Sequence, residues 1–130
     1  MKRLITTLCL VLALSVPPVW ALDKEPFTQA RFDELQKNDE LVLVDVFADW
    51  CSTCAKQQKI LSDYVSQHPE VDLHILEVNY DEDKKTVRKL RAPRQSTLLL
   101  YSGEEQYWYS VAETDREVIF DTLNRAAEAQ

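Results

Sequence analysis

Apolar residues gather in four short runs that predict β-strands. Residues 41–47 (LVLVDVF) are almost continuously apolar, interrupted only by Asp45, which is typical of a strand buried on both faces. Residues 71–78 and 97–101 form the next two runs. Residues 106–111 follow a Ser-Gly turn and are expected to pair with the third run as a hairpin.

Between these runs, apolar residues return every three or four positions, the spacing of helices that bury one face. A helix over residues 28–38 begins at a threonine cap, and Thr114 forms a capping box with Glu117 that begins a last helix. Two further helices are predicted over residues 51–67 and from a cap at Asp81 to about residue 91.

The predicted order of elements is therefore α-β-α-β-α-β-β-α. Strands that alternate with helices form a parallel sheet covered on both faces, and the final hairpin adds antiparallel strands. We expect an α/β fold with a central mixed sheet flanked by helices. Residues 22–26 leave open whether another edge strand precedes the first helix.

The N-terminus has the pattern of a secretory signal peptide. Lys2 and Arg3 precede an apolar stretch over residues 4–16, and small residues at Val19 and Ala21 suit a cleavage site after Ala21. We therefore assign residues 1–21 to a signal peptide and residues 22–130 to one domain. An uncleaved N-terminal anchor is the weaker alternative, because the apolar run is short for a membrane span.

Charge and cysteine content narrow the possible functions. The formal net charge of the 130-residue chain is −7, and removal of Lys2 and Arg3 with the signal peptide makes it −9. This sign argues against nucleic acid or an anionic membrane as a partner. Cys9 leaves with the signal peptide, so Cys51 and Cys54 are the two cysteines of the predicted domain.

The segment Cys51-Ser-Thr-Cys54 stands where a strand ends and a helix begins. A bridge between cysteines three positions apart closes too small a loop to be an effective structural staple. At a helix N-terminus, however, free N–H groups and the helix dipole favour a thiolate. This placement predicts a redox-active pair in which Cys51 is the nucleophile and Cys54 resolves the mixed disulfide.

With these residues, the chain resembles the thioredoxin-fold family in the stretches LVLVDVFADWCSTC, EVNYD and STLLLYSGE. The segment FADWC is especially similar to the C-terminal thioredoxin-like domain of DsbD-type membrane thiol reductases. The resemblance implies a thioredoxin fold and a periplasmic thiol–disulfide oxidoreductase without a cofactor or metal. It also implies protein disulfides as substrates and a membrane thiol reductase of the DsbD/CcdA type as electron donor. We expect a monomer.

Three residues near the dithiol receive roles from their position and from this resemblance. Asp45, six residues before Cys51, should be buried with a raised pKa, and in the family such an acid helps to deprotonate Cys54. The alternative is an aspartate that reaches water. Trp50 either contacts partners or packs in the core. Glu77 occupies a position where relatives carry lysine, and it either lies near Asp45 or points into solvent.

The loop before the third run departs from the family. A cis-proline is expected before Thr97, but Ser96 stands there, and Pro93 is too early to replace it. A cis bond before a non-proline residue costs about 2.5–4 kcal/mol, so we expect a trans bond between Gln95 and Ser96. By resemblance, Gln95, Ser96 and Thr97 belong to the substrate-binding loop, so partner choice and reduction potential are the properties most affected.

Two functions follow from these observations. The first is an exported reductant or electron relay, because Asp45, Asp49 and Glu77 make the neighbourhood acidic and disfavour the Cys51 thiolate. The second is a thioredoxin-like binding module that holds a protein or metal ion without turnover. His68 and His74 lie far from the dithiol in the sequence and do not suggest a metal site by themselves.

Overall fold

The computed structural model describes residues 24–130. The predicted signal peptide over residues 1–21 and the cleavage site after Ala21 lie outside the described residues. Within residues 24–130, no helix has the length and apolar character needed to cross a membrane.

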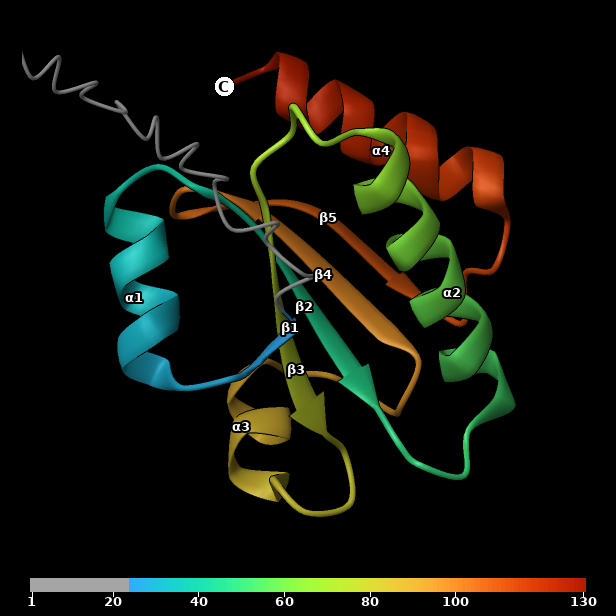
Figure 1. The fold of residues 1–130 in the computed structure, drawn as a ribbon. Coiled ribbons are helices and arrows are strands. Elements are labelled where there is room, and N and C mark those ends of the chain that lie inside the picture. The colour runs from blue at the N-terminus through green and yellow to red at the C-terminus, as the bar shows by residue number, and fades with distance from the viewer. Residues whose placement is uncertain (1–23) are drawn as a thin grey trace, which may run out of the picture.

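The described residues form one sheet and its covering helices, in the order β-α-β-α-β-α-β-β-α (Figure 1). The elements are β1 (Lys24–Pro26), α1 (Gln29–Lys37), β2 (Leu41–Phe47), α2 (Ser52–Gln67), β3 (Leu73–Asn79), α3 (Lys84–Lys89), β4 (Thr97–Ser102), β5 (Glu105–Val111) and α4 (Arg116–Glu128).

The sheet has five strands in the spatial order β1-β3-β2-β4-β5. Strands β1, β3 and β2 run parallel to one another, β4 is antiparallel to β2, and β5 is antiparallel to β4. The prediction of a mixed sheet that ends in an antiparallel hairpin is confirmed. The short strand β1 answers the question that residues 22–26 left open, because it extends the parallel edge of the sheet.

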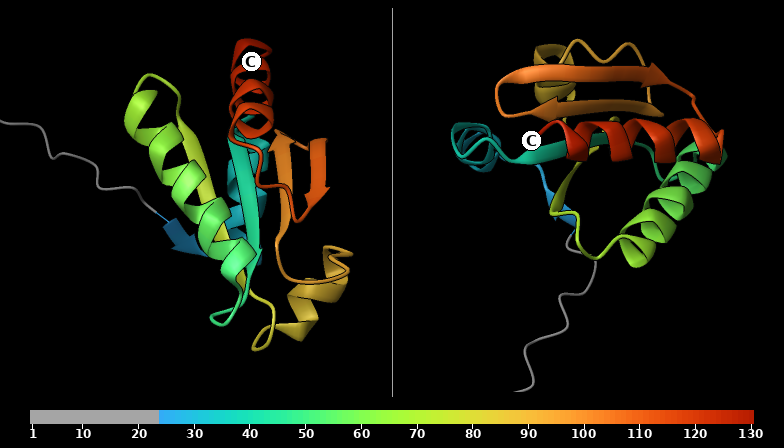
Figure 2. Two further views of the ribbon diagram at one scale, coloured as in Figure 1. Left: turned by 90° about the vertical axis from the view of Figure 1, so that its right-hand side faces the viewer. Right: turned by 90° about the horizontal axis from the view of Figure 1, so that it is seen from above.

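Helices α2 and α4 cover one face of the sheet, and α1 and α3 cover the other (Figures 1 and 2). Two apolar cores result. Phe32 and Leu35 of α1 pack with Val87 of α3 in one core, whereas Leu61 of α2 packs with Leu123 of α4 in the other. Central strand β2 contributes to both cores, as its continuous apolar run predicted.

Alternation along β2 decides which core each of its side chains enters. Val42, Val44 and Val46 join the core under α1 and α3, whereas Leu41 and Leu43 join the core under α2 and α4. The next residue of the second set is Asp45. The pleat of β2 therefore directs a carboxyl group toward the helix that follows the dithiol.

Two predicted helix starts were wrong, and the structure gives the reason for each. Helix α3 is capped by Asp83 and not by Asp81, because the Asp83 side chain accepts a hydrogen bond from the Thr86 N–H (3.0 Å). Helix α4 is capped by Asp115 and not by Thr114. The carboxylate of Asp115 accepts bonds from two N–H groups of the first turn, and aspartate is the stronger cap.

Candidate active site

The two cysteines lie at the N-terminus of α2, where the sequence placed them. Cys51 is the N-cap residue of the helix, and its Sγ accepts a hydrogen bond from the N–H of Cys54 (3.0 Å). Cys51 and Cys54 form a disulfide with a Cα–Cα distance of 5.2 Å. A sulphur at this position faces unpaired N–H groups of the first helical turn, which favour a negative charge on it.

The two sulphur-bearing residues differ in exposure. Cys51 is 7% exposed and Cys54 is 1% exposed, and both pack against Ala48 and Phe47 at the end of β2. Cys51 is thus the residue that an incoming disulfide reaches first, whereas Cys54 is sealed behind it. The roles of Cys51 as nucleophile and Cys54 as resolving thiol stay predictions.

Asp45 is completely buried, as predicted, and does not reach water. One carboxylate oxygen, Oδ2, accepts a hydrogen bond from Nε2 of Gln58 (3.3 Å), and the other has no partner among the described residues. Burial raises the pKa of Asp45 from an ordinary value of 3.8 to about 7. Gln58 follows Cys54 by four residues on the same face of α2, so Asp45 lies about one helical turn below the dithiol.

Glu77 does lie near Asp45, which settles the alternative that the sequence left open. The two residues are register partners on β2 and β3, and the negative charge of Glu77 contributes to the raised pKa of Asp45. Glu77 is also paired: its Oε1 lies 3.4 Å from Nζ of Lys24 on β1. Lys24 therefore places a cation beside the two acids and opposes part of this effect.

Ser96 lies directly against the disulfide. Its Oγ is 3.1 Å from Sγ of Cys51 and 3.2 Å from Sγ of Cys54, and the residue is completely buried. All peptide bonds of the described residues are trans, so the expected trans bond between Gln95 and Ser96 is confirmed. Ser96 instead adopts a left-handed backbone conformation with φ +62°.

The other residues of the predicted substrate loop flank Ser96. Gln95 is half-buried before it, and Thr97 is buried after it as the first residue of β4. The hydroxyl of Thr97 donates to the carbonyl oxygen of Arg94 (2.6 Å), so this side chain fixes the loop. Binding of substrate by Gln95, Ser96 and Thr97 stays a prediction.

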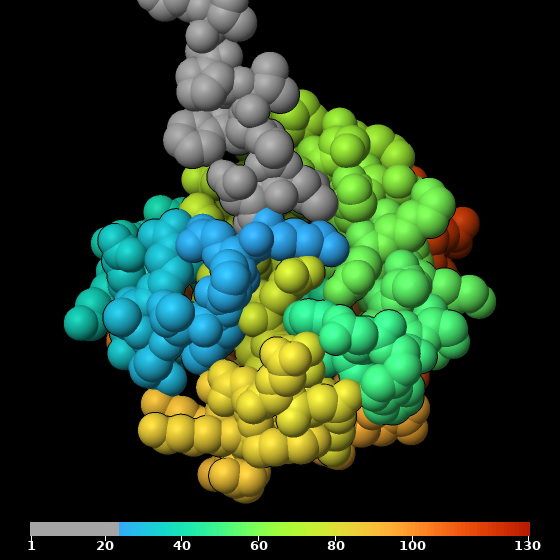
Figure 3. All heavy atoms as spheres, turned by 60° about the horizontal axis from the view of Figure 1, so that its bottom comes forward, coloured from blue at the N-terminus to red at the C-terminus, as the bar shows by residue number. Residues whose placement is uncertain are grey.

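Trp50 lies on the surface beside the dithiol and not in the core. It is 66% exposed, and its indole Nε1 donates to Oδ2 of Asp81 (2.7 Å). Figure 3 shows this end of the molecule, where the loop after β2 (teal-green) lies next to the segment before α3 (yellow). The N–H of Tyr80 also bonds to the carbonyl oxygen of Phe47 (2.7 Å), which ties the two loops together.

The family model for thioredoxin matches residues 23–125, a range that includes the five strands, the first three helices, the dithiol and most of α4. The chain belongs to the thioredoxin family. It is 30% identical to thioredoxin of Chlamydia pneumoniae over 87 residues, which are 67% of this chain and 83% of that protein. It is also 30% identical to Thioredoxin-1 of Saccharomyces cerevisiae over 79 residues, 61% of this chain and 75% of that protein.

Among solved structures, the chain is similar to Trxlp from Edwardsiella tarda. The TM-score is 0.73 with 36% identity, and the match covers 78% of this chain and 98% of that one. The predicted thioredoxin fold is confirmed. Thioredoxins act on protein disulfides, and the Cys51–Cys54 pair gives this chain the same chemistry. The chain is a thiol–disulfide oxidoreductase.

Three residues that the sequence did not single out contribute to the site. Gln57 is completely buried, and its Nε2 donates to the carbonyl oxygens of Ser96 (3.2 Å) and Glu113 (2.9 Å). Gln58 holds Asp45, and Lys24 pairs with Glu77. A signal for the glutamines was present, because they follow Cys54 by three and four positions on the buried face of the helix.

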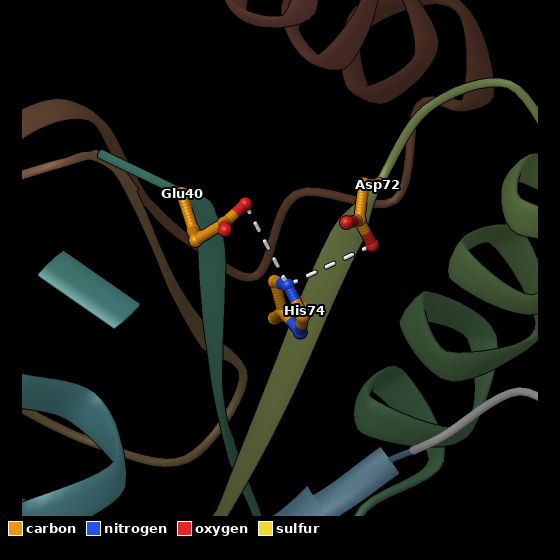
Figure 4. Close-up of side chains that lie close together, drawn as sticks. All are labelled: Glu40, Asp72 and His74. Atoms are coloured by element: carbon orange, nitrogen blue, oxygen red, sulfur yellow. Dashed lines mark ion pairs between the residues drawn. The ribbon is translucent and has the colours of Figure 1, made fainter. Parts of the chain in front are cut away.

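A separate cluster lies at the opposite end of the parallel strands (Figure 4). Nε2 of His74 is 3.6 Å from Oδ1 of Asp72 and 3.9 Å from Oε2 of Glu40. The ligand atoms lie within 4.8 Å of one another, so these residues could hold a metal ion. Polar contacts of His74 with two acids that reach solvent account equally for their arrangement. The cluster is remote from the dithiol and takes no part in its chemistry.

Proposed function

We propose that the chain is an exported, periplasmic thiol–disulfide oxidoreductase that works as a reductant or electron relay. The observation that carries this proposal is a disulfide at the N-terminus of α2 with a carboxyl group buried about one turn below it. Such an acid exchanges protons near neutral pH, because the pKa of Asp45 is raised to about 7.

The reaction follows from these positions. The Cys51 thiolate attacks one sulphur of a protein disulfide, a bond forms between them, and the other substrate sulphur leaves as a thiolate. Cys54 then gives its proton to the Asp45 carboxylate, directly or through one water molecule, and attacks Sγ of Cys51. The second substrate sulphur leaves. Two electrons have passed from the dithiol to the substrate, and the Cys51–Cys54 disulfide is restored.

The charges around the dithiol support the direction of electron flow. Strong oxidants stabilise their reduced form, in which the nucleophilic cysteine is a thiolate. Here Asp45 and Glu77 lie on the same face of the sheet below α2, and Asp49 is exposed in the loop before Cys51. Negative charge near the dithiol raises the free energy of a thiolate, which favours the disulfide and lowers the reduction potential.

The proposed location and donor rest on the sequence. Residues 1–21 have the charge and apolar pattern of a signal peptide, and cleavage after Ala21 leaves β1 intact. A reductant in an oxidising compartment must be recharged, and the FADWC segment resembles the DsbD-type reductases. We therefore propose a membrane thiol reductase of the DsbD/CcdA type as electron donor, and a monomeric protein that acts on protein disulfides. Ser96, in place of the family's cis-proline, is proposed to adjust partner choice.

The reduction potential of the Cys51–Cys54 pair tests this proposal. Residues 22–130 are equilibrated with glutathione or dithiothreitol buffers, and the thiols are trapped and counted. We expect a potential near that of thioredoxin, about −270 mV, and well below that of a strong periplasmic oxidant at about −120 mV. A value near the oxidant would contradict the proposed direction of electron flow.

Matched cysteine variants test turnover in the same preparation. We expect Cys51→Ser to abolish the reduction of insulin disulfides, because no nucleophile remains. We expect Cys54→Ser to accumulate a mixed disulfide at Cys51, because the second step is lost. If the Cys51→Ser variant kept its biological function, the chain would act as a binding module and the proposal would be wrong.

A further inference from the structure

The hydroxyl of Ser96 lies beside the disulfide, at nearly equal distances of 3.1 and 3.2 Å from the two sulphurs. We propose that Ser96 is a catalytic residue whose O–H donates to whichever sulphur carries negative charge during the reaction. The inference rests on the dithiol chemistry of the proposed function, but it assigns a role to a group outside the two cysteines and Asp45.

The surrounding structure holds Ser96 in this place. Its carbonyl oxygen accepts two hydrogen bonds, one from Nε2 of Gln57 (3.2 Å) and one from the N–H of Ala112 (2.8 Å). Thr97 closes the preceding loop through its bond to Arg94. These contacts come from α2, from the residue that follows β5 and from the loop itself, so they determine the backbone on both sides of the serine.

The backbone conformation of Ser96 is unfavourable by itself. A φ of +62° belongs to the left-handed region, which side chains with a Cβ rarely adopt. Such conformations persist where the surroundings impose them, and they gather at functional sites. Here the left-handed conformation of Ser96 directs its hydroxyl toward both sulphurs in a completely buried position.

The chemistry of the hydroxyl suits a charge that moves between two atoms. A serine has one O–H proton to donate, and disulfide or thiol sulphur is a weak acceptor, whereas a bond to a charged acceptor is shorter and stronger. The hydroxyl therefore gains most when a thiolate forms at Cys51 or Cys54. Because both sulphurs are within reach, rotation about the Cβ–Oγ bond redirects the proton without movement of the backbone.

This donor has a consequence for the redox equilibrium. Two electrons and one proton convert the disulfide to one thiolate and one thiol, and only the reduced form offers Ser96 a charged acceptor. The hydroxyl thus stabilises the reduced state and opposes the acidic groups around the dithiol. It also lowers the pKa of the attacking thiol, which increases the thiolate available at neutral pH.

The test compares Ser96→Ala and Ser96→Gly with wild type. Both variants lack the hydroxyl, but glycine tolerates the left-handed conformation and alanine does not. Ser102→Ala, at the far end of β4, is the matched control. The readouts are the pH dependence of Cys51 alkylation in the reduced protein and the reduction potential, with circular dichroism to verify folding.

We expect both Ser96 variants to raise the pKa of the Cys51 thiol by about one unit, a tenfold loss of thiolate below that pKa. At a pH above the thiol pKa of wild type and variants, the potential should fall by about 30 mV, which is a tenfold change in the redox equilibrium for two electrons. The Ser102→Ala control should match wild type. Alkylation profiles of both Ser96 variants that coincide with wild type would overturn the inference.

Recovery of the wild-type profile by Ser96→Gly, but not by Ser96→Ala, would also overturn it, because backbone strain would then explain the effect. The wild-type potential tests the proposed direction of electron flow, whereas the difference between wild type and the variants tests Ser96. The two proposals can therefore fail separately.

Discussion

Asp45 and Glu77 both carry a carboxyl group and lie at paired positions of neighbouring parallel strands, but their surroundings differ. Asp45 is completely buried and has one hydrogen bond, from Gln58 at 3.3 Å. The side chain of Glu77 is 24% exposed and lies 3.4 Å from the ammonium group of Lys24. Because the two positions are equivalent in the sheet, the raised pKa of Asp45 follows from its burial and its partners.

The difference has a functional consequence. The pKa of Asp45 rises to about 7 chiefly because burial removes its charged form from water. The bond from Gln58 opposes this rise, the charge of Glu77 adds to it, and Lys24 opposes it more weakly. The sheet thus holds Asp45, a carboxyl group that can accept a proton at neutral pH, beside Glu77, whose negative charge raises the pKa of Asp45.

Replacement of the buried acid should have the largest effect. Between pH 4 and pH 7 the folded protein keeps a proton on Asp45 that the unfolded chain releases, so wild type loses stability as the pH rises through this window. A pKa difference of this size corresponds to about 4 kcal/mol. We expect Asp45→Asn to gain about 2–4 kcal/mol over wild type between pH 4 and pH 8, measured by urea unfolding.

The same variant should reduce insulin disulfides at least about tenfold more slowly at pH 7, because Cys54 loses its proton acceptor. Glu104→Gln is the matched control, since it removes an exposed carboxylate from the turn between β4 and β5, away from the dithiol. It should change neither the pH dependence of stability nor the rate by a comparable amount. A stability difference independent of pH would contradict the raised pKa of Asp45.

Loss of the hydrogen bond to Asp45 should have an intermediate effect. Gln58→Met keeps the length and helix propensity of the side chain but removes the N–H donor that favours the carboxylate. We expect the pKa of Asp45 to rise further, by about one unit, when followed by carbon NMR of the carboxyl group. Gln67→Met, exposed at the end of the same helix, is the control. An unchanged titration of Asp45 in Gln58→Met would show that Gln58 does not affect the protonation of Asp45.

Much of the fold and of the site around Asp45 could be predicted from the sequence, because the signals for them are local. The apolar run around Asp45 indicated both a central strand and a buried acid. The spacing of Cys51 and Cys54 after that strand predicted a helix N-terminus. The hairpin followed from a turn between two apolar runs. Each of these inferences depends on residues within a few positions of one another.

The features that the sequence did not predict depend on contacts between segments that are distant in the sequence. Lys24 reaches Glu77 only because β1 pairs with β3, and three residues at 24–26 are too few to predict a strand. Gln57 contacts Ser96 and Glu113, which lie 39 and 56 residues away. Local sequence predicts Asp81 as a helix cap, whereas in the fold its carboxylate accepts a hydrogen bond from the Trp50 indole.

The smallest effect should come from the ion pair beside the buried acid. Glu77→Gln removes a negative charge and should lower the pKa of Asp45, whereas Lys24→Met removes a positive charge and should raise it. We expect each change to be less than about one pH unit, because both groups reach solvent. Titration of Asp45 by carbon NMR in each variant measures the two shifts and their signs.

Salt separates this electrostatic contribution from burial. Screening lengths fall from about 10 Å at 0.1 M salt to about 3 Å at 1 M, so the shifts in the Glu77 and Lys24 variants should shrink at high salt. The raised pKa of Asp45 in wild type should persist there, since burial does not depend on ions. Glu25→Gln is the control, because Glu25 pairs with Arg31 and contributes nothing to the pKa of Asp45. Shifts of the same sign in both variants would show that altered packing, and not charge, acts on Asp45.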